Sequence, residues 1–97
     1  MNEAISTNVE MIVQYGQTMV EIDRQTAIKL GYSYLLFTFD IINNNGVVEP
    51  VYNKAFVRDL NDVYRLVKQK LIDLTTVHIV DVETGLEVDH SVFKKGE

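Results

Sequence analysis

The chain has 97 residues, of which 46% are hydrophobic and 24% charged, and its formal net charge is −5. These values predict one globular domain with a small core. The absence of cysteine excludes disulfides, thiolate nucleophiles and cysteine-ligated zinc. Because disulfides are typical of small secreted domains, we expect a cytoplasmic setting. Because residues 1–8 are mostly polar and no apolar run approaches the roughly 18 residues of a membrane span, we expect neither a targeting leader nor a membrane partner.

The first third of the chain predicts a β-hairpin followed by a short helix. Residues 9–15 would place Val9, Met11, Val13 and Tyr15 on one face of an extended strand, and Gly16 offers a turn into a second strand over residues 18–22. The next segment, residues 23–30, begins with a good helix-capping residue. It is followed by Gly31, a residue type that often closes helices in the left-handed conformation.

The central segment predicts a long β-hairpin. Residues 32–42 are aromatic and β-branched with alternating faces, and the Asn-Asn-Asn-Gly run at residues 43–46 is a strong turn signal. The returning strand, residues 47–57, contains Pro50, which has no N–H to donate to a ladder. We therefore expect this strand at or near an edge of the sheet.

The strongest helical pattern covers about residues 60–74. Its apolar residues recur at steps of three and four, which gives one core-facing stripe, and either Asp59 or Asn61 can cap its first turn. The cations of this segment fall away from the stripe. The helix is therefore expected to pack on the sheet and to present a basic outer surface.

A second hairpin is predicted from residues 77–82 and 86–90. A three-residue loop with Gly85 in the left-handed position would place Val80 opposite Val88 on the apolar face. The same register places Val82 opposite Leu86 on that face and leaves Asp81 opposite Glu87 on the other.

Together these elements predict the α+β fold class, as a small single domain spanning residues 1–97. The predicted sheet is predominantly antiparallel and built from hairpins, and the one main helix, at about residues 60–74, packs on one of its faces. The chain ends, residues 1–8 and 94–97, are expected to be frayed.

Four carboxylates concentrate on the predicted C-terminal hairpin. The expected register sets Asp81 opposite Glu87, and like charges that face each other on a sheet are destabilising, which invites a cationic partner. A protein with a basic surface would satisfy them, whereas a merely solvated acidic face is the alternative interpretation. The predicted partner-binding residues are Asp81, Glu83, Glu87 and Asp89.

A basic surface is the second candidate site. Residues 54–70 carry five cations and two anions, a net charge of +3, which leaves −8 for the remainder of the chain. These cations could contact nucleic-acid phosphates, with Tyr52 or Tyr64 stacking on bases. Because a chain with a pI near 4.9 repels a polyanion elsewhere, nucleic acid ranks below protein as a partner. The alternative basic surface consists of Arg58, Arg65, Lys68 and Lys70.

Catalytic and metal-binding signals are weak. The expected register brings His78 opposite His90, a pair that could bind a metal only with a third ligand such as Asp89. The sequence contains no Gly-rich phosphate loop, no Gly-x-Ser-x-Gly elbow and no helical His-x-x-x-His pair. We therefore expect no enzyme activity, no cofactor and no metal.

The predicted function is that of a non-catalytic, small acidic binding protein. Its acidic surface would occupy a basic protein, such as one that binds nucleic acid, and so regulate or inhibit it, with fast and salt-sensitive association. Free-standing acidic inhibitors of this size are often encoded by phages or plasmids, which is the origin we expect. One alternative is a self-assembling structural protein, a homo-oligomer joined through an exposed strand edge. Another is a nucleic-acid-binding regulator that uses the basic helix.

Overall fold

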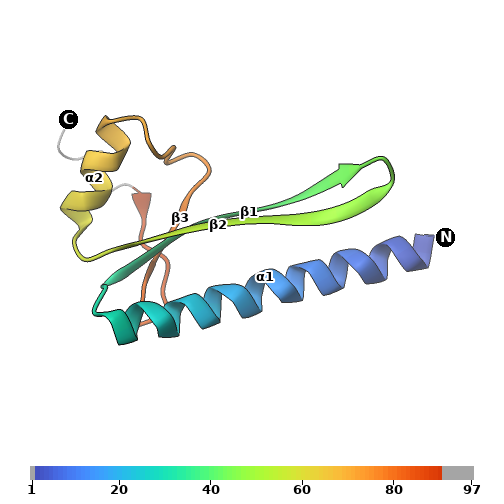
Figure 1. Cartoon of the computed structure of the whole chain (residues 1–97), viewed down its shortest axis with the longest axis horizontal. Coiled ribbons are helices and arrows are strands. Elements are labelled where there is room, and N and C mark those ends of the chain that lie inside the picture. The colour runs from blue at the N-terminus through green and yellow to red at the C-terminus, as the bar shows by residue number, and fades with distance from the viewer. Residues whose placement is uncertain (1, 91–97) are drawn as a thin grey trace.

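The computed structural model describes the backbone of residues 2–90 and the side chains of residues 9–90 (Figure 1). Its strands form one antiparallel sheet in the order β2-β1-β3, which confirms the predicted α+β class. The prediction of a frayed C-terminus at residues 94–97 lies outside the described residues. In chain order the elements are α1 (Asn2–Leu30), β1 (Tyr34–Asn44), β2 (Val47–Val57), α2 (Leu60–Lys68) and β3 (His78–Asp81).

The central hairpin confirms the sequence prediction. Strands β1 and β2 pair along their whole length, and the two residues between them, Asn45 and Gly46, have φ of 54° and 85°. Positive φ at both positions is the signature of a type I′ turn, whose twist matches that of the flanking strands. The strand that contains Pro50 lies at the edge of the sheet, as expected.

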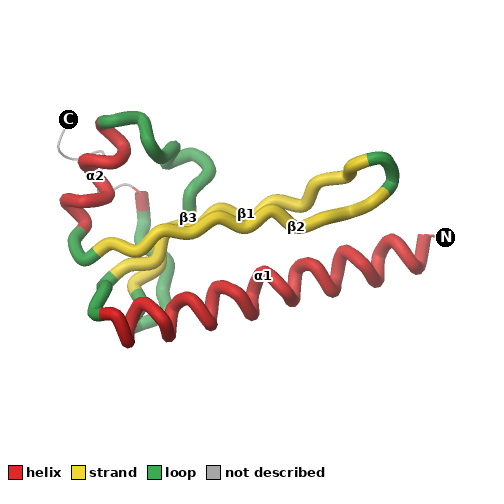
Figure 2. Tube along the Cα trace, viewed as in Figure 1, coloured by secondary structure: helices red, strands yellow, loops and turns green. Residues whose placement is uncertain are grey.

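The hairpin extends well beyond the rest of the sheet. Strand β3 pairs only with residues 34–37 of β1, so residues 38–53 form a two-stranded ribbon that runs alongside α1 (Figures 1 and 2). We call this ribbon, together with residues 9–20 of α1, the arm, and the remainder of the described chain the head. The molecule is accordingly elongated, with extents of 49 × 30 × 18 Å.

The first helix is the main departure from the sequence prediction, because the expected hairpin over residues 9–22 is wrong. These residues belong to α1, which continues to Leu30 and ends where Gly31 takes φ of 83°, as predicted for that glycine. Gly16 lets the helix approach the sheet closely, since a Cβ there would lie 2.8 Å from the Phe39 ring. The buried and half-buried small and apolar residues of the helix recur at helical spacing: Val9, Ile12, Gly16, Met19, Val20 and Ala27.

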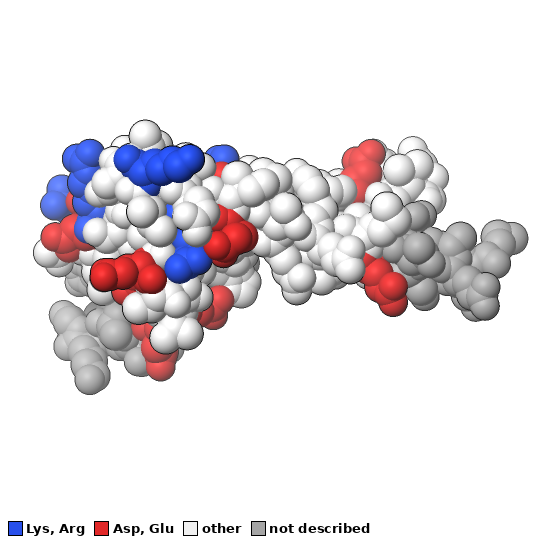
Figure 3. All heavy atoms as spheres, turned by 90° about the horizontal axis from the view of Figure 1, so that it is seen from below, with Lys and Arg blue, Asp and Glu red and all other residues white. Residues whose placement is uncertain are grey.

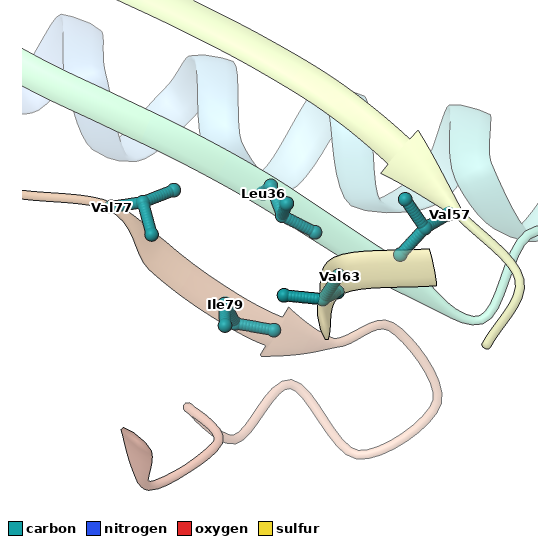
Figure 4. Packing of buried hydrophobic residues seen from close by; sticks show 5 residues of the cluster. All are labelled: Leu36, Val57, Val63, Val77 and Ile79. Atoms are coloured by element: carbon teal, nitrogen blue, oxygen red, sulfur yellow. The ribbon is translucent and has the colours of Figure 1, made fainter. Parts of the chain in front are cut away.

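The core consists of two clusters on opposite faces of the sheet, because adjacent β1 residues point in opposite directions. Leu36 faces the cluster under α2, where Val57, Val63, Val77 and Ile79 meet (Figure 4). The preceding residue, Leu35, faces the second cluster, which also contains the buried residues Ala27, Val80 and Val82. Thus α2 covers one face of the head, as expected, and α1 covers the other.

Helix α2 begins as predicted and ends earlier. The Asp59 carboxylate accepts a hydrogen bond of 2.8 Å from the Asn61 N–H, which caps the first turn. At the other end Lys70 takes a left-handed φ of 61°, and the Leu71 N–H donates to the Leu66 carbonyl. This is a Schellman closure, so the predicted helical segment 69–74 is wrong.

The C-terminal hairpin is only partly formed, and its register differs by one residue from the prediction. Val80 forms an isolated bridge with Glu87 instead of facing Val88. The cause is Val82, which is buried and donates its N–H to the Ser33 carbonyl at 3.0 Å, so that it extends the pairing of β3 with β1 instead of closing the turn.

Candidate functional site

The predicted partner-binding carboxylates lie on a turn that we call the acidic turn, residues 81–89. Its first residue has a structural role: Asp81 Oδ1 accepts hydrogen bonds from the N–H groups of Glu83 at 2.9 Å and Thr84 at 3.4 Å. The turn is closed by the Gly85 N–H, which donates to the Asp81 carbonyl at 2.8 Å. Asp81 is half-buried and its carboxylate holds the turn together, whereas the residues of the other three carboxylates are exposed.

Arg24 of α1 braces this turn from the outside. Its Nε donates to the Val82 carbonyl at 2.7 Å, its Nη2 to the Glu83 carbonyl at 3.4 Å, and its Nη1 forms an ion pair of 3.0 Å with Glu21. A Cβ at Gly85 would lie 3.4 Å from the Arg24 guanidinium, so the turn packs closely against it. The backbone of the acidic turn is thus fixed to α1.

His78 does not pair with His90 as the predicted register required. Its Nδ1 lies 2.8 Å from Glu87 Oε1, and its ring stacks on Phe37 with the centroids 5.0 Å apart. Among the side chains that the structure describes, residues 9–90, no group of three histidines or carboxylates could hold a metal ion. Glu87 keeps 58% of its side chain exposed in spite of this contact.

The three remaining carboxylates, Glu83, Glu87 and Asp89, belong to exposed residues of the head. Figure 3 shows acidic and basic side chains gathered at the head, whereas the visible face of the arm is almost entirely uncharged. The charged side chains described on the arm are all carboxylates: Glu10, Asp40 and Glu49.

The cations of the alternative basic surface each have different immediate neighbours. Arg58 lies over the Tyr32 ring at 5.0 Å, on the connection between β2 and α2, whereas Lys68 lies over Tyr64 at 4.8 Å on α2 itself. Arg65 is exposed beside Asp62 at 3.4 Å. Lys70 is exposed at the end of α2, where its backbone closes the helix.

A buried carboxylate that sequence reasoning treated only as a helix cap lies between α1 and β2. Asp23 is 2% exposed, and its two oxygens accept 2.7 Å hydrogen bonds from the Tyr52 hydroxyl and the Lys54 ammonium. Burial raises the pKa of the Tyr52 hydroxyl well above its usual range, and the hydrogen bond to Asp23 and the charge of that carboxylate add to the effect. Tyr52 is therefore committed to this contact, and the arrangement stabilises the packing of α1 on the sheet. The sequence signal for this contact was the position of Asp23 four residues before Ala27, which is buried, because residues at that spacing share one face of a helix.

An open apolar groove runs along the arm between α1 and β1, lined by Val13, Val20, Phe37, Phe39 and Ile41. This lining offers apolar contact and no acid–base group.

No helix within residues 2–90 is both long and apolar enough to cross a lipid bilayer. The chain matches no protein-family model, and neither a curated protein nor a solved structure is significantly similar to it. The function of this chain is therefore inferred from its surfaces.

Proposed function

We propose that the protein is a non-catalytic binding module whose acidic turn docks on the basic surface of another protein and thereby regulates or inhibits it. The observation that supports this proposal is the bracing of the turn by Arg24, through its 2.7 Å hydrogen bond to the Val82 carbonyl. A turn that is ordered before binding loses less conformational freedom when the partner arrives, so more of the contact free energy appears as affinity.

Charge favours the same partner class. Glu83, Glu87 and Asp89 are exposed on the braced turn, and the chain as a whole carries a net charge of −5. Such a field increases the association rate with a basic protein by about tenfold or more at low salt, and this gain decreases as ionic strength rises. Proteins that bind nucleic acids present basic surfaces of this kind and are the partners we propose first.

The test compares two variants with the same charge change at different places. The turn variant Glu83→Gln/Glu87→Gln/Asp89→Asn and the arm variant Glu10→Gln/Asp40→Asn/Glu49→Gln each raise the net charge from −5 to −2. Asp81 is left unchanged because its carboxylate caps the turn. Tagged wild-type and variant proteins are used to capture partners from host lysate, with and without nuclease and across a salt series.

We expect the wild type and the arm variant to retain a nuclease-resistant protein that elutes as salt rises, and the turn variant to lose it. If both variants lose it equally, overall charge explains the binding and the acidic turn is not the site. Recovery of nucleic acid alone, removed by nuclease, would also contradict the proposal.

A further variant tests the hydrogen bonds of Arg24 to the turn separately from the carboxylates of the turn. Arg24→Lys keeps the net charge but removes the forked contact with Val82 and Glu83. We expect the captured partner to bind this variant more weakly with an unchanged salt dependence, because the number of carboxylates on the turn is the same. An unchanged affinity would show that the brace contributes nothing to recognition.

A further inference from the structure

One flank of α1 is apolar and exposed. Met11, Tyr15 and Ile22 are 61%, 45% and 51% exposed, and at 3.6 residues per turn they lie within about 40° of one another around the helix axis. We call these three residues the apolar flank. Together with the sheet-facing stripe they extend the apolar arc of α1 to about 200°, roughly twice the arc typical of a helix with a single buried face.

The flank lies on the side of α1 that borders the edge strand. Asp23 reaches β2, through its hydrogen bonds to Tyr52 and Lys54, whereas Arg24 on the other side reaches the turn that follows β3. Since the strand order is β2-β1-β3, the flank faces outward beside β2. No element of residues 2–90 pairs with the outer edge of β2.

The molecule has surplus surface for its size. The radius of gyration is 15.4 Å, compared with about 12.5 Å for a compact domain of this length. The accessible surface is 7006 Å², whereas a folded monomer of this mass exposes about 5,700 Å². This excess belongs to the whole elongated chain, and the apolar flank is a part of it that lies on one side of α1 and stays 45–61% exposed.

We propose that two copies of the chain pair through their apolar flanks, with the α1 helices antiparallel about a twofold axis. An axis between Tyr15 and Thr18 sets Met11 of one copy against Ile22 of the other and Tyr15 against Thr18, so the flank is complementary to itself. Uncovered apolar area of this kind is stabilised by burial against an equally apolar surface. This pairing goes beyond the proposed docking of the acidic turn and does not depend on it.

Charge selects the antiparallel arrangement. Lys29 is the charged residue of α1 that shares the angular position of Met11, at the far end of the helix, and parallel helices would bring the two Lys29 side chains together. Antiparallel helices place them at opposite ends and also oppose the helix dipoles favourably. Pairing of two β2 edges is less suitable, because Pro50 lacks the N–H that strand addition requires.

The test measures the mass of the full chain by sedimentation equilibrium, from low micromolar to several hundred micromolar, at low and high salt. We expect the wild type to reach twice the chain mass and to keep it at high salt, since apolar contacts hold the pair. Ile22→Glu should raise the dissociation constant at least about a hundredfold, because each copy would bury an unpaired carboxylate. Ile28→Glu is the matched control: this residue is 46% exposed on another side of α1 and should leave the pair intact.

A charge-pair variant tests the orientation. Met11→Lys/Ile22→Glu places opposite charges against each other only in the antiparallel pair, so it should restore association that Ile22→Glu abolishes. A wild type that remains monomeric at several hundred micromolar would overturn the proposal, as would equal effects of Ile22→Glu and Ile28→Glu. Loss of pairing in the turn variant described above, with no effect of Ile22→Glu, would assign self-association to the acidic turn and also overturn it.

Discussion

A single buried carboxylate fixes the position of the long helix on the sheet. Asp23 is removed from water, and the free-energy cost of that burial is offset by two charge-assisted contacts, from Tyr52 and Lys54, at 2.7 Å each. Replacing Tyr52 by phenylalanine would leave one oxygen of Asp23 without its donor. The cost of such an unsatisfied buried acceptor is about 1–3 kcal/mol of unfolding free energy.

This contact predicts how stability depends on alkaline pH. The folded-state pKa of Tyr52 is raised, whereas an unfolded chain titrates its tyrosines near about 10. Below that pH both states are protonated and the contribution is fully present. As pH rises towards the folded-state pKa, only the unfolded state loses the proton, and stability decreases by up to about 1.4 kcal/mol per pH unit. Urea unfolding of the wild type and Tyr52→Phe above pH 9 measures this slope, and equal slopes would show that Tyr52 is not its source.

The two helices close in the same way with different residues. In α1 the left-handed position is occupied by Gly31 at φ of 83°, and in α2 by Lys70 at φ of 61°. In both, the next N–H bonds back to a carbonyl five residues earlier, from Tyr32 to Ala27 and from Leu71 to Leu66. A residue with a Cβ is strained in this conformation, whereas glycine is not.

We therefore expect Lys70→Gly to increase the unfolding free energy by about 1 kcal/mol. Gly31→Ala, the reciprocal change at the end of α1, should decrease it by a similar amount. Both effects are measurable by urea denaturation of the purified chain. A destabilised Lys70→Gly variant would mean that the lysine side chain contributes more to the head than its backbone strain costs.

The elements with a single hydrophobic period were predictable, and α1 was not. Strands β1 and β2 are rich in aromatic and β-branched residues and meet at the turn residues Asn45 and Gly46, so sequence and structure agree there. Over residues 9–15 apolar residues also alternate, because Val9 and Val13 lie towards the sheet while Met11 and Tyr15 form the flank. An apolar arc of about 200° satisfies a strand period and a helix period at once, and only tertiary packing decides between them.

The candidate site was predictable in composition and not in geometry. The exposed carboxylates Glu83, Glu87 and Asp89 were identified from their clustering, but the brace was not, since Arg24 is 58 residues from Val82 in sequence. The one-residue register difference has the same origin. Val82 pairs with Ser33, and a contact between distant segments leaves no local pattern to read.

At the scale of the whole molecule, packing is unequal between the head and the arm. Leu35 and Leu36 lie between the two core clusters, whereas Ile41, Ile42 and Val47, near the tip of the hairpin, remain exposed. Strand β1 therefore passes from a region covered on both faces to a two-stranded ribbon. Local opening needs least free energy where few apolar contacts are broken.

Amide hydrogen exchange should report this gradient along one strand. We expect the amides of Leu35 and Leu36 to exchange close to the rate of global unfolding, and those of residues 41–44 to exchange orders of magnitude faster. Site-resolved exchange by NMR at low protein concentration checks the prediction. Uniform protection along β1 would contradict it and would indicate that the arm is covered in solution.

The position of Arg24 along α1 has a further consequence for the proposed pair. The brace lies towards the C-terminal end of the helix, so an antiparallel pair centred between Tyr15 and Thr18 would carry its two acidic turns on opposite sides of the axis. At 1.5 Å per residue they would be separated by about 22 Å along the helix direction. A partner with basic sites at that repeat would be held at both, and the second contact would form at a high effective concentration. Bivalency would then let two individually weak docking sites act as one tight one.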